Sequence, residues 1–377
     1  MKRLSALLLL LCSLSISAQN TRIQQVPLTQ VHLSDAFWTP RIESSRTVST
    51  STAFHECEQN DTACCESCAV IADINRNQRM FLETGDSKYI DFIEHTLYNN
   101  VLSCVSLSGD RFFCNNVLES SGEHERQQWS DCATCASNIT RLIASVPGYM
   151  YAIEKKGRRK EPSSIYVNLY AQSTVNVGRM VLEQQTDYPW DGKVRIKVKK
   201  GSGLLTMKLR MPSWLKASPT NNDLYTYLDR ARPYSLSVNG RSFYPEIHDY
   251  ITIRRTWKVG DVIELDFPMN VRRIVANDSV ENLRGKVCLE RGPIVYCLEA
   301  YDQPDCHVFN KYILQDTPIS AHFEKYLLGG IVVLEGQAKQ VKLDGNVSDI
   351  SFRAIPYAVW NNRGPQAMEV WITSKLF

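Results

Sequence analysis

Two short cysteine-rich runs hold most of the side chains of this sequence that could bind a metal or take part in catalysis. They hold six of the twelve cysteines, namely Cys57, Cys64, Cys65, Cys68, Cys132 and Cys135. In each run one thiol lies three residues from another, and acidic side chains such as Glu66 lie nearby. A soft divalent metal such as zinc selects clustered thiolates of this kind. Alternatively, the same cysteines could form disulfides or serve as small buried residues of the core.

One arrangement of these thiols follows from spacing alone. Cys64 and Cys68 lie four residues apart, as on one face of a helix, and Cys132 and Cys135 lie three apart. Together the four would form a structural zinc site of four thiolates. Such a site is closed, so it leaves no metal position for a substrate.

The N-terminus has the layout of a cleaved secretory signal peptide. A basic start, Lys2 and Arg3, precedes an apolar stretch over 7–11, and small residues follow at Ser17 and Ala18. We expect residues 1–18 to be removed and the protein to be secreted or periplasmic. Without Cys12 eleven cysteines remain, an odd number, so at least one must be free, metal-bound or intermolecular. Metal coordination best tolerates clustered thiolates in an oxidising compartment.

Length and charge exclude several classes of protein. The chain has 377 residues, 43 basic and 40 acidic, with a net charge of +3. Because basic and acidic residues are nearly balanced, the sequence does not predict the positively charged surface that binds nucleic acid. The basic run 155–160 is typical of a solvated linker. After the N-terminal stretch no segment approaches the ~18 apolar residues of a membrane span. The length allows two or three domains.

Apolar residues follow a helical period in the first part of the chain. The pattern predicts a short N-terminal strand within 26–33, where Pro27 favours an edge position, and then helices over 61–84, 86–101 and 137–155. Pro147-Gly148 predicts a kink or break in the last helix. Ile90, Ile93 and Leu97 form an apolar face that must be covered, either by the sheets or by a second copy in an oligomer.

Beyond Pro162 the period changes to two. Alternating apolar residues predict many short strands, and Asn239-Gly240 predicts a two-residue hairpin turn. Short strands at close spacing are typical of antiparallel β-sandwiches. We therefore expect an α+β multidomain protein with an N-terminal strand segment over 19–58, a helical domain over 59–160, and two sandwich domains over 161–275 and 276–377.

In order along the chain, these landmarks resemble glycoside hydrolase family 127, the β-L-arabinofuranosidase family. The matching stretches are residues 26–28, 37–41, 60–63, 66–68, 79–86, 97–102, 132–141, 147–149, 166–170, 211–214, 354–357 and 360–365. The resemblance implies an (α/α) toroid followed by β-sandwich domains. It also implies a retaining glycosidase mechanism on arabinose-containing glycans, with a cysteine thiolate nucleophile beside Zn²⁺ and a glutamate acid/base.

The resemblance assigns the site residues only in part. Glu66 and Cys68 match the family's Glu-x-Cys metal ligands, and Cys135 matches a third ligand. The nucleophile position falls on Thr134, whose hydroxyl does not ionise near neutral pH. Cys132 is the candidate substitute thiolate and a further metal ligand, and Cys64 is a second candidate substitute. Because residues two apart on a regular helix point about 200° apart, Glu66 and Cys68 can share an ion only at an irregular helix start.

The helical domain is shorter than the resemblance requires. A toroid of a dozen helices needs more than ~200 residues, whereas only about 100 separate Glu58 from Pro162. We infer a deletion at Glu58-Gln59 that removes the acid/base segment, and Cys114 replaces a tyrosine of the family. The enzyme is therefore expected to be weak or inactive. The alternatives are a non-catalytic carbohydrate-binding or structural remnant and a disulfide-stapled adaptor.

Three other residues have both a functional and a structural interpretation. His124 lies among Glu119, Glu123 and Glu125, where a solvated loop is the favoured interpretation. Trp190 and Trp214 could stack on sugars, but a place in the core is the commoner use of such side chains.

Overall fold

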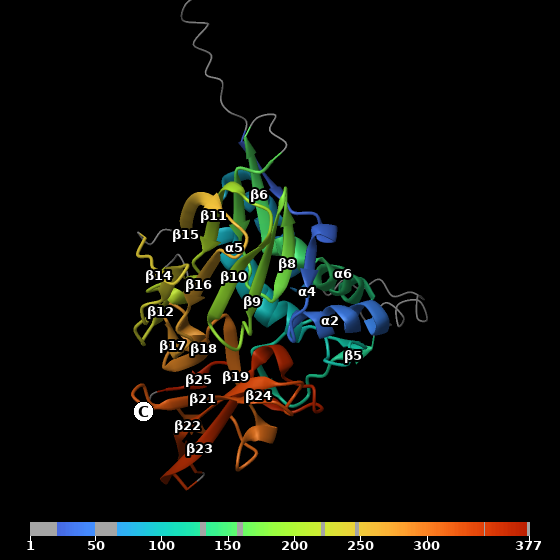
Figure 1. The fold of residues 1–377 in the computed structure, drawn as a ribbon. Helices are drawn as coiled ribbons and strands as arrows, with labels where there is room; N and C mark the ends of the chain where they lie inside the picture. Colours follow the sequence, from blue (N-terminus) through green and yellow to red (C-terminus); the bar gives the residue numbers. More distant parts are fainter. Residues whose placement is uncertain are drawn as a thin grey trace, which may run out of the picture.

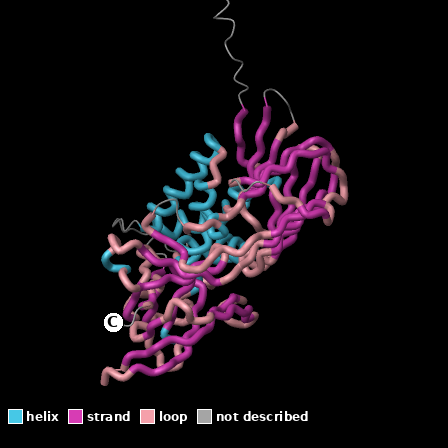
Figure 2. The backbone as a smooth tube through the Cα atoms, turned by 90° about the vertical axis from the view of Figure 1, so that its left-hand side faces the viewer, coloured by secondary structure: helices cyan, strands magenta, loops and turns pink. Residues whose placement is uncertain are grey.

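The computed structural model describes residues 21–49, 66–128, 133–156, 161–219, 223–245, 249–342 and 344–374. The helices lie in the first part of the chain and most strands follow, so the predicted mixture of helix and sheet is confirmed (Figure 1). Figure 2 shows the helices gathered together and flanked by strands. The expected signal peptide 1–18, Cys64 and Cys132 lie outside the described residues.

Five helical elements lie close to the predicted helices: α4 (Glu66–Thr84), α5 (Lys88–Thr96), the π-helical η3 (Leu97–Val101), α6 (Ala133–Ser145) and α7 (Pro147–Met150). Two further elements, α2 (Trp38–Ser44) and the π-helical η2 (Ser45–Ser49), were not predicted. Gly85 ends α4 with a φ of 72°, a conformation that glycine adopts without strain. The Asp86 carboxylate then accepts the backbone N–H of Lys88 at 3.0 Å, although the N-cap residue of α5 is Ser87, which makes no side-chain cap bond.

Two sheets form the middle of the molecule and take their edges from the N-terminal segment. The five-stranded sheet has the order β1 (Thr21–Gln25), β6 (Tyr151–Lys156), β7 (Ser164–Val167), β11 (Gly203–Arg210) and β15 (Tyr250–Trp257). The seven-stranded sheet has the order β14 (Arg241–Ser242), β13 (Ser235–Val238), β16 (Val262–Asp266), β10 (Lys193–Lys200), β9 (Met180–Thr186), β8 (Ser173–Val177) and β2 (Val31–Leu33). The strand that follows Pro27 is thus an edge strand, as predicted.

The remaining strands form a C-terminal sheet of eleven. Its order is β12 (Tyr225–Tyr227), β17 (Val271–Ala276), β18 (Lys286–Arg291), β25 (Ile372–Thr373), β20 (Lys311–Tyr312), β22 (Ile331–Val341), β23 (Val347–Pro356), β19 (Ile294–Glu299), β24 (Ala367–Glu369) and β4 (Glu119–Ser121), with β21 (Ile319–Glu324) paired to β22. A separate pair joins β3 (Arg111–Phe112) to β5 (Gln127–Gln128). The sheet therefore recruits β4 from the helical region and β12 from the segment before 271.

Two details of the expected secondary structure were wrong. The helix predicted over 137–155 breaks at Val146, as Pro147 indicated, but from Tyr151 the chain is the strand β6. This strand pairs with β1 on one side and β7 on the other, and those partners outweigh its local preference. Within the middle sheets β7 and β11 run parallel, so the expected purely antiparallel arrangement does not hold.

The apolar face of α5 and η3 is covered within the chain. Ile90, Ile93 and Leu97 are each 0% exposed, and they belong to one core cluster with residues of the middle and C-terminal sheets. Asn99 of η3 ties this region to the C-terminal sheet, because its side chain donates to Pro293 O and accepts from Val295 N, each at 2.8 Å. Of the two expected ways of covering this face, the sheets provide the cover, and no second copy is required for it.

Candidate functional site

Cys68 and Cys135 lie near the starts of two packed helices, α4 and α6. The beginning of α4 is held by Ser67, whose hydroxyl donates to Phe113 O at 3.0 Å and to Cys114 O at 2.8 Å. Helix N-termini carry unpaired N–H groups and a positive partial charge. Both cysteines therefore lie where the backbone favours negative charge.

The two sulfur atoms face each other at 3.3 Å, although the residues are 67 positions apart in sequence. Cys135 is buried and Cys68 is partly exposed, and the Asn138 amide donates to Cys68 Sγ at 3.5 Å. The separation is too long for a disulfide, which needs about 2.05 Å. Two thiolates on one tetrahedral zinc lie about 3.8 Å apart, so a shift of roughly 0.5 Å would admit the ion. The donor chemistry fits zinc.

The other predicted site residues cannot be placed around this sulfur pair. Glu66 is the first residue of α4, and its side chain is outside the described atoms, so the predicted sharing of one ion with Cys68 stays a prediction. Thr134 lies in the first turn of α6, also without a described side chain. Cys132 and Cys64 lie outside the described residues. The ligand set and the nucleophile position therefore stay predictions.

Three further buried cysteines do not offer a replacement nucleophile. Burial raises the pKa of the Cys104 thiol to about 11 and the pKa values of Cys288 and Cys297 well above their ordinary range. These groups are neutral thiols at physiological pH and therefore poor nucleophiles. Cys114, where the resemblance implies a tyrosine, is disulfide-bonded.

His124 and the tryptophans have structural roles. The His124 ring stacks on Phe113 at 4.7 Å, and its Nε2 lies 2.8 Å from Asn115 O. Trp214 is 5% exposed and donates to the Tyr188 hydroxyl at 3.2 Å, while Trp190 packs against the core. Trp214 is therefore a buried residue and Trp190 a partly buried one, as the core interpretation predicts.

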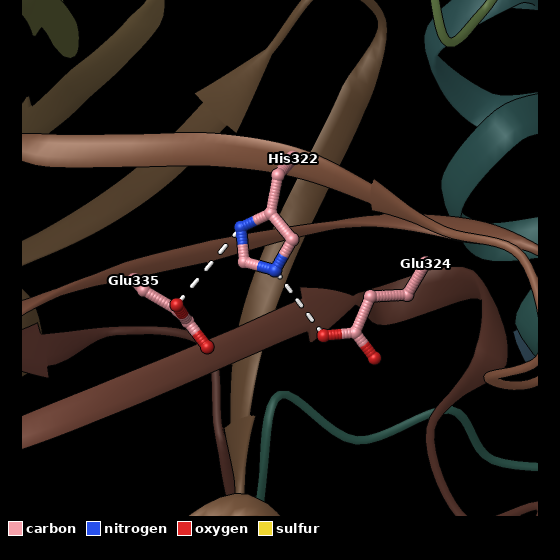
Figure 3. Close-up of side chains that lie close together, drawn as sticks. All are labelled: His322, Glu324 and Glu335. Atoms are coloured by element: carbon pink, nitrogen blue, oxygen red, sulfur yellow. Dashed lines mark hydrogen bonds and ion pairs between the residues drawn. The ribbon is translucent and has the colours of Figure 1, made fainter.

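A histidine and two glutamates come together in the C-terminal sheet, and no sequence pattern predicted this group. His322 Nε2 lies 3.2 Å from Glu324 Oε1, and Nδ1 lies 3.9 Å from Glu335 Oε2 (Figure 3). Within the described residues this is the group of three with metal-ligand spacing. Arg353, however, donates to Glu335 at 2.9 Å and pairs with Glu324, so the carboxylates already have a cation. The group is a partly exposed ion-pair network.

A buried acid lies where α5 meets the C-terminal sheet. Glu290 is 3% exposed, accepts a hydrogen bond from the Tyr227 hydroxyl, and lies 3.9 Å from His95 Nε2. Burial raises the pKa of Glu290 to about 7. It lines a cavity of about 450 Å³ with aromatic walls that include Trp214, Tyr225 and Trp371. No sequence pattern predicted this acid, because most of β18 is buried and a glutamate is unexpected in a buried strand.

With the fold in view, comparison with known proteins defines the class. The β-L-arabinofuranosidase GH127 catalytic domain matches residues 48–148, the GH127 middle domain matches 164–269, and the glycoside hydrolase family 127 C-terminal domain matches 271–373. The chain is thus built from three consecutive modules of one glycoside hydrolase type, and the sulfur pair lies in the module that matches the catalytic domain. The chain belongs to glycoside hydrolase family 127.

Relatives of known activity and structure agree with this assignment. The non-reducing end β-L-arabinofuranosidase of Bifidobacterium longum subsp. longum is 28% identical over 83% of this chain and 49% of that protein. A solved GH127 β-arabinofuranosidase, BT3674, is 39% identical with a TM-score of 0.77, over 82% of this chain and 49% of that one. Ara127N-Se, a GH127 β-L-arabinofuranosidase from Geobacillus stearothermophilus T6, is 36% identical with a TM-score of 0.71, over 84% and 51%. The chain spans about half the length of these relatives.

The part of the chain that the structure describes holds no helix long and apolar enough to cross a membrane.

Proposed function

We propose that this chain is an exported, β-L-arabinofuranosidase-like protein that engages arabinose-containing glycans and retains a zinc-thiolate centre, but catalyses hydrolysis weakly or not at all. The observation that carries the proposal is the sulfur pair of Cys68 and Cys135 at 3.3 Å, in the segment that matches the family's catalytic domain. The substrate class comes from the relatives, which are β-L-arabinofuranosidases.

Glu66, Cys68 and Cys135 would hold the zinc ion. When bound, the ion would keep neighbouring thiols deprotonated, which is the state in which sulfur is a ligand or a nucleophile. Asn138 orients Cys68 by donating to its sulfur, and the burial of Cys135 excludes water from one side of the pair. These contacts resemble the outer hydrogen bonds that orient ligands in metal sites.

Low activity is expected because the nucleophile position is substituted and the acid/base segment is missing. Thr134 stands at the nucleophile position, and a threonine hydroxyl is a far weaker nucleophile than a thiolate. The chain matches only about half of its relatives' length, in keeping with a helical domain over 59–160 that is a partial toroid without the acid/base segment. On this proposal 161–275 and 276–377 are β-sandwich domains.

Export is supported by the signal-like N-terminus over 1–18 and by the disulfide at Cys114, because disulfides persist in oxidising compartments.

The second candidate function is a non-catalytic glycan-binding or structural remnant built on the sheets. Thr134 and the half-length match favour it, since both remove catalytic parts while the middle and C-terminal modules are matched over 164–269 and 271–373.

Restoring the thiol separates these candidates. We expect Thr134→Cys to raise kcat on an aryl β-L-arabinofuranoside by on the order of 10²-fold, because it supplies the nucleophile that the family uses. Adding Cys135→Ser should abolish the gain, and Cys132→Ser should abolish any turnover of the natural chain if Cys132 is the substitute. The measurement is steady-state release of the aryl group. No turnover in the natural chain or in Thr134→Cys, together with retained glycan binding, would establish the remnant instead.

Metal analysis of the purified protein tests the zinc centre directly. We expect about one zinc per chain, and we expect Cys68→Ser to lower zinc affinity by about 100-fold or more, because it removes a ligand rather than an orienting group. Cys306→Ser is the matched control, since Cys306 is exposed and free. Zinc-free protein in which Cys68 and Cys135 are oxidised would contradict the centre and favour the disulfide-stapled adaptor.

A further inference from the structure

The C-terminal sheet carries an open cleft of about 810 Å³ that is separate from the cysteine pair. Its walls come from β22, β23 and the 3-10 turn η7 (Ala300–Asp302), with Arg363 closing one side. A cleft of this volume lies in the size range of small-ligand sites, ~300–1,000 Å³.

Polar side chains line up across the paired strands of this cleft. In the register of β22 and β23, Glu335 is opposite Arg353 and Gln337 is opposite Ser351, so all four share one face of the sheet. Gln337 and Ser351 are exposed. Arg353 donates through Nε to Glu335 at 2.9 Å and through Nη2 to Glu324, and its Nη1 has no protein acceptor within the described residues. The strip thus offers donors and acceptors in fixed positions.

An aromatic ring stands beside this strip. Tyr301 is 66% exposed, and the Arg363 guanidinium lies 4.8 Å from the centre of its ring. Arg363 is itself fixed by Asp302, at 2.8 Å from its Nη1, and by Glu299. The ring is therefore supported by a rigid cation and still presents most of its surface to solvent.

The charges of the cleft select among ligands. Arg353 and Arg363 are each paired with two carboxylates, so the network has more acidic than basic groups. An anionic ligand would meet no unpaired cation. A neutral, polyhydroxylated ligand suits both the aromatic ring, which packs on the apolar face of a sugar, and the planar polar groups, which bond to hydroxyls.

We propose that this cleft is a non-catalytic binding site for a neutral glycan chain, with Tyr301 as the stacking platform and Gln337, Ser351 and Arg353 as hydrogen-bonding groups. Only the choice of an arabinose-containing probe rests on the proposed function. The site itself follows from the cleft, whether or not the cysteine pair supports catalysis.

Calorimetric titration of the full chain with a branched, neutral arabinan tests the proposal. We expect Tyr301→Ala to weaken binding about 3- to 10-fold, as expected for the loss of one aromatic contact. Gln337→Ala should weaken it further when combined with Tyr301→Ala. Tyr244→Ala is the matched control, because Tyr244 is 89% exposed but lies in the middle module, outside the cleft. Polygalacturonate, an acidic chain, should bind much more weakly than arabinan.

Unchanged arabinan binding by Tyr301→Ala, or equal binding of polygalacturonate, would overturn the cleft proposal. The catalytic proposal fails separately, through absent turnover in Thr134→Cys. Because Tyr301 and Tyr244 are both largely exposed, unchanged thermal midpoints will show that neither variant acts through misfolding.

Discussion

Replacing Arg210 by methionine is expected to lower the free energy of unfolding by about 3–5 kcal/mol, the usual cost of removing one partner from a buried ion pair. The Arg210 side chain is 0% exposed, and its Nη1 lies 2.5 Å from Asp91 Oδ1 while its Nη2 pairs with Glu94. Its Nε also donates to Asn168 O at 2.5 Å. Methionine fills a similar volume but leaves the buried Glu94 without its cation and Asp91 with Lys216 alone, at 3.4 Å.

This ion pair connects parts of the chain that are far apart in sequence. Asp91 and Glu94 lie on α5, and Arg210 ends β11, so the arginine fastens the helical region to the five-stranded sheet. Burial raises the pKa of Glu94, and Arg210 acts in the opposite direction. Without the arginine, Glu94 is expected to take up a proton. The loss should therefore be greater at pH 8 than at pH 5, because protonation removes part of the uncompensated charge.

Urea unfolding measures the effect. Arg179→Met is the control, since Arg179 pairs with Glu161 at 3.2 Å but is 79% exposed, and its loss should change stability by less than about 0.5 kcal/mol. Adding Asp91→Asn and Glu94→Gln to Arg210→Met should recover part of the loss. If Arg210→Met lowers the free energy of unfolding by less than about 1 kcal/mol, the ion pair does not stabilise the contact between α5 and the five-stranded sheet.

Glu290→Gln is expected to stabilise the protein at pH 8 by about 2–3 kcal/mol and to leave it nearly unchanged at pH 5. Burial raises the pKa of Glu290 to about 7 from an ordinary value of 4.5. Between pH 4.5 and pH 7 the folded chain therefore holds a proton that the unfolded chain releases. Stability from this group is therefore present below pH 4.5 and is lost as the pH rises through 7. Glutamine keeps an oxygen to accept the Tyr227 hydrogen bond and has no charge to bury.

The pH dependence of stability gives the readout for this second prediction. Burial also raises the pKa of Glu369, to about 8, so Glu290→Gln should flatten the decline between pH 5 and pH 8 without abolishing it. Glu281→Gln, at a position with a 79% exposed side chain, should leave the profile unchanged. A profile for Glu290→Gln that runs parallel to that of the natural chain would contradict a buried, protonated Glu290.

Local sequence patterns determined the elements whose causes lie within a few residues. Asn239 and Gly240 have φ values of 53° and 75°, and the hairpin of β13 and β14 turns at them, as the dipeptide predicted. Gly85 ends α4, and Pro147 breaks the helix that begins with α6. The motifs also identified the family, because they recur in order along nearly the whole chain.

Features that depend on contacts between segments far apart in sequence could be seen only in the tertiary structure. β6 became a strand because β1 and β7 bind both of its edges, and no local pattern records that choice. Arg210 meets Asp91 across 119 residues and Cys68 meets Cys135 across 67, so single residues in the sequence could suggest these partners but not their contact. Which residues are able to bind metal, ionise or turn the chain can be predicted without the fold, since those are properties of residue types and short spacings. Only folding determined which of them meet, because burial and nearest neighbours are set by how the sheets and helices pack.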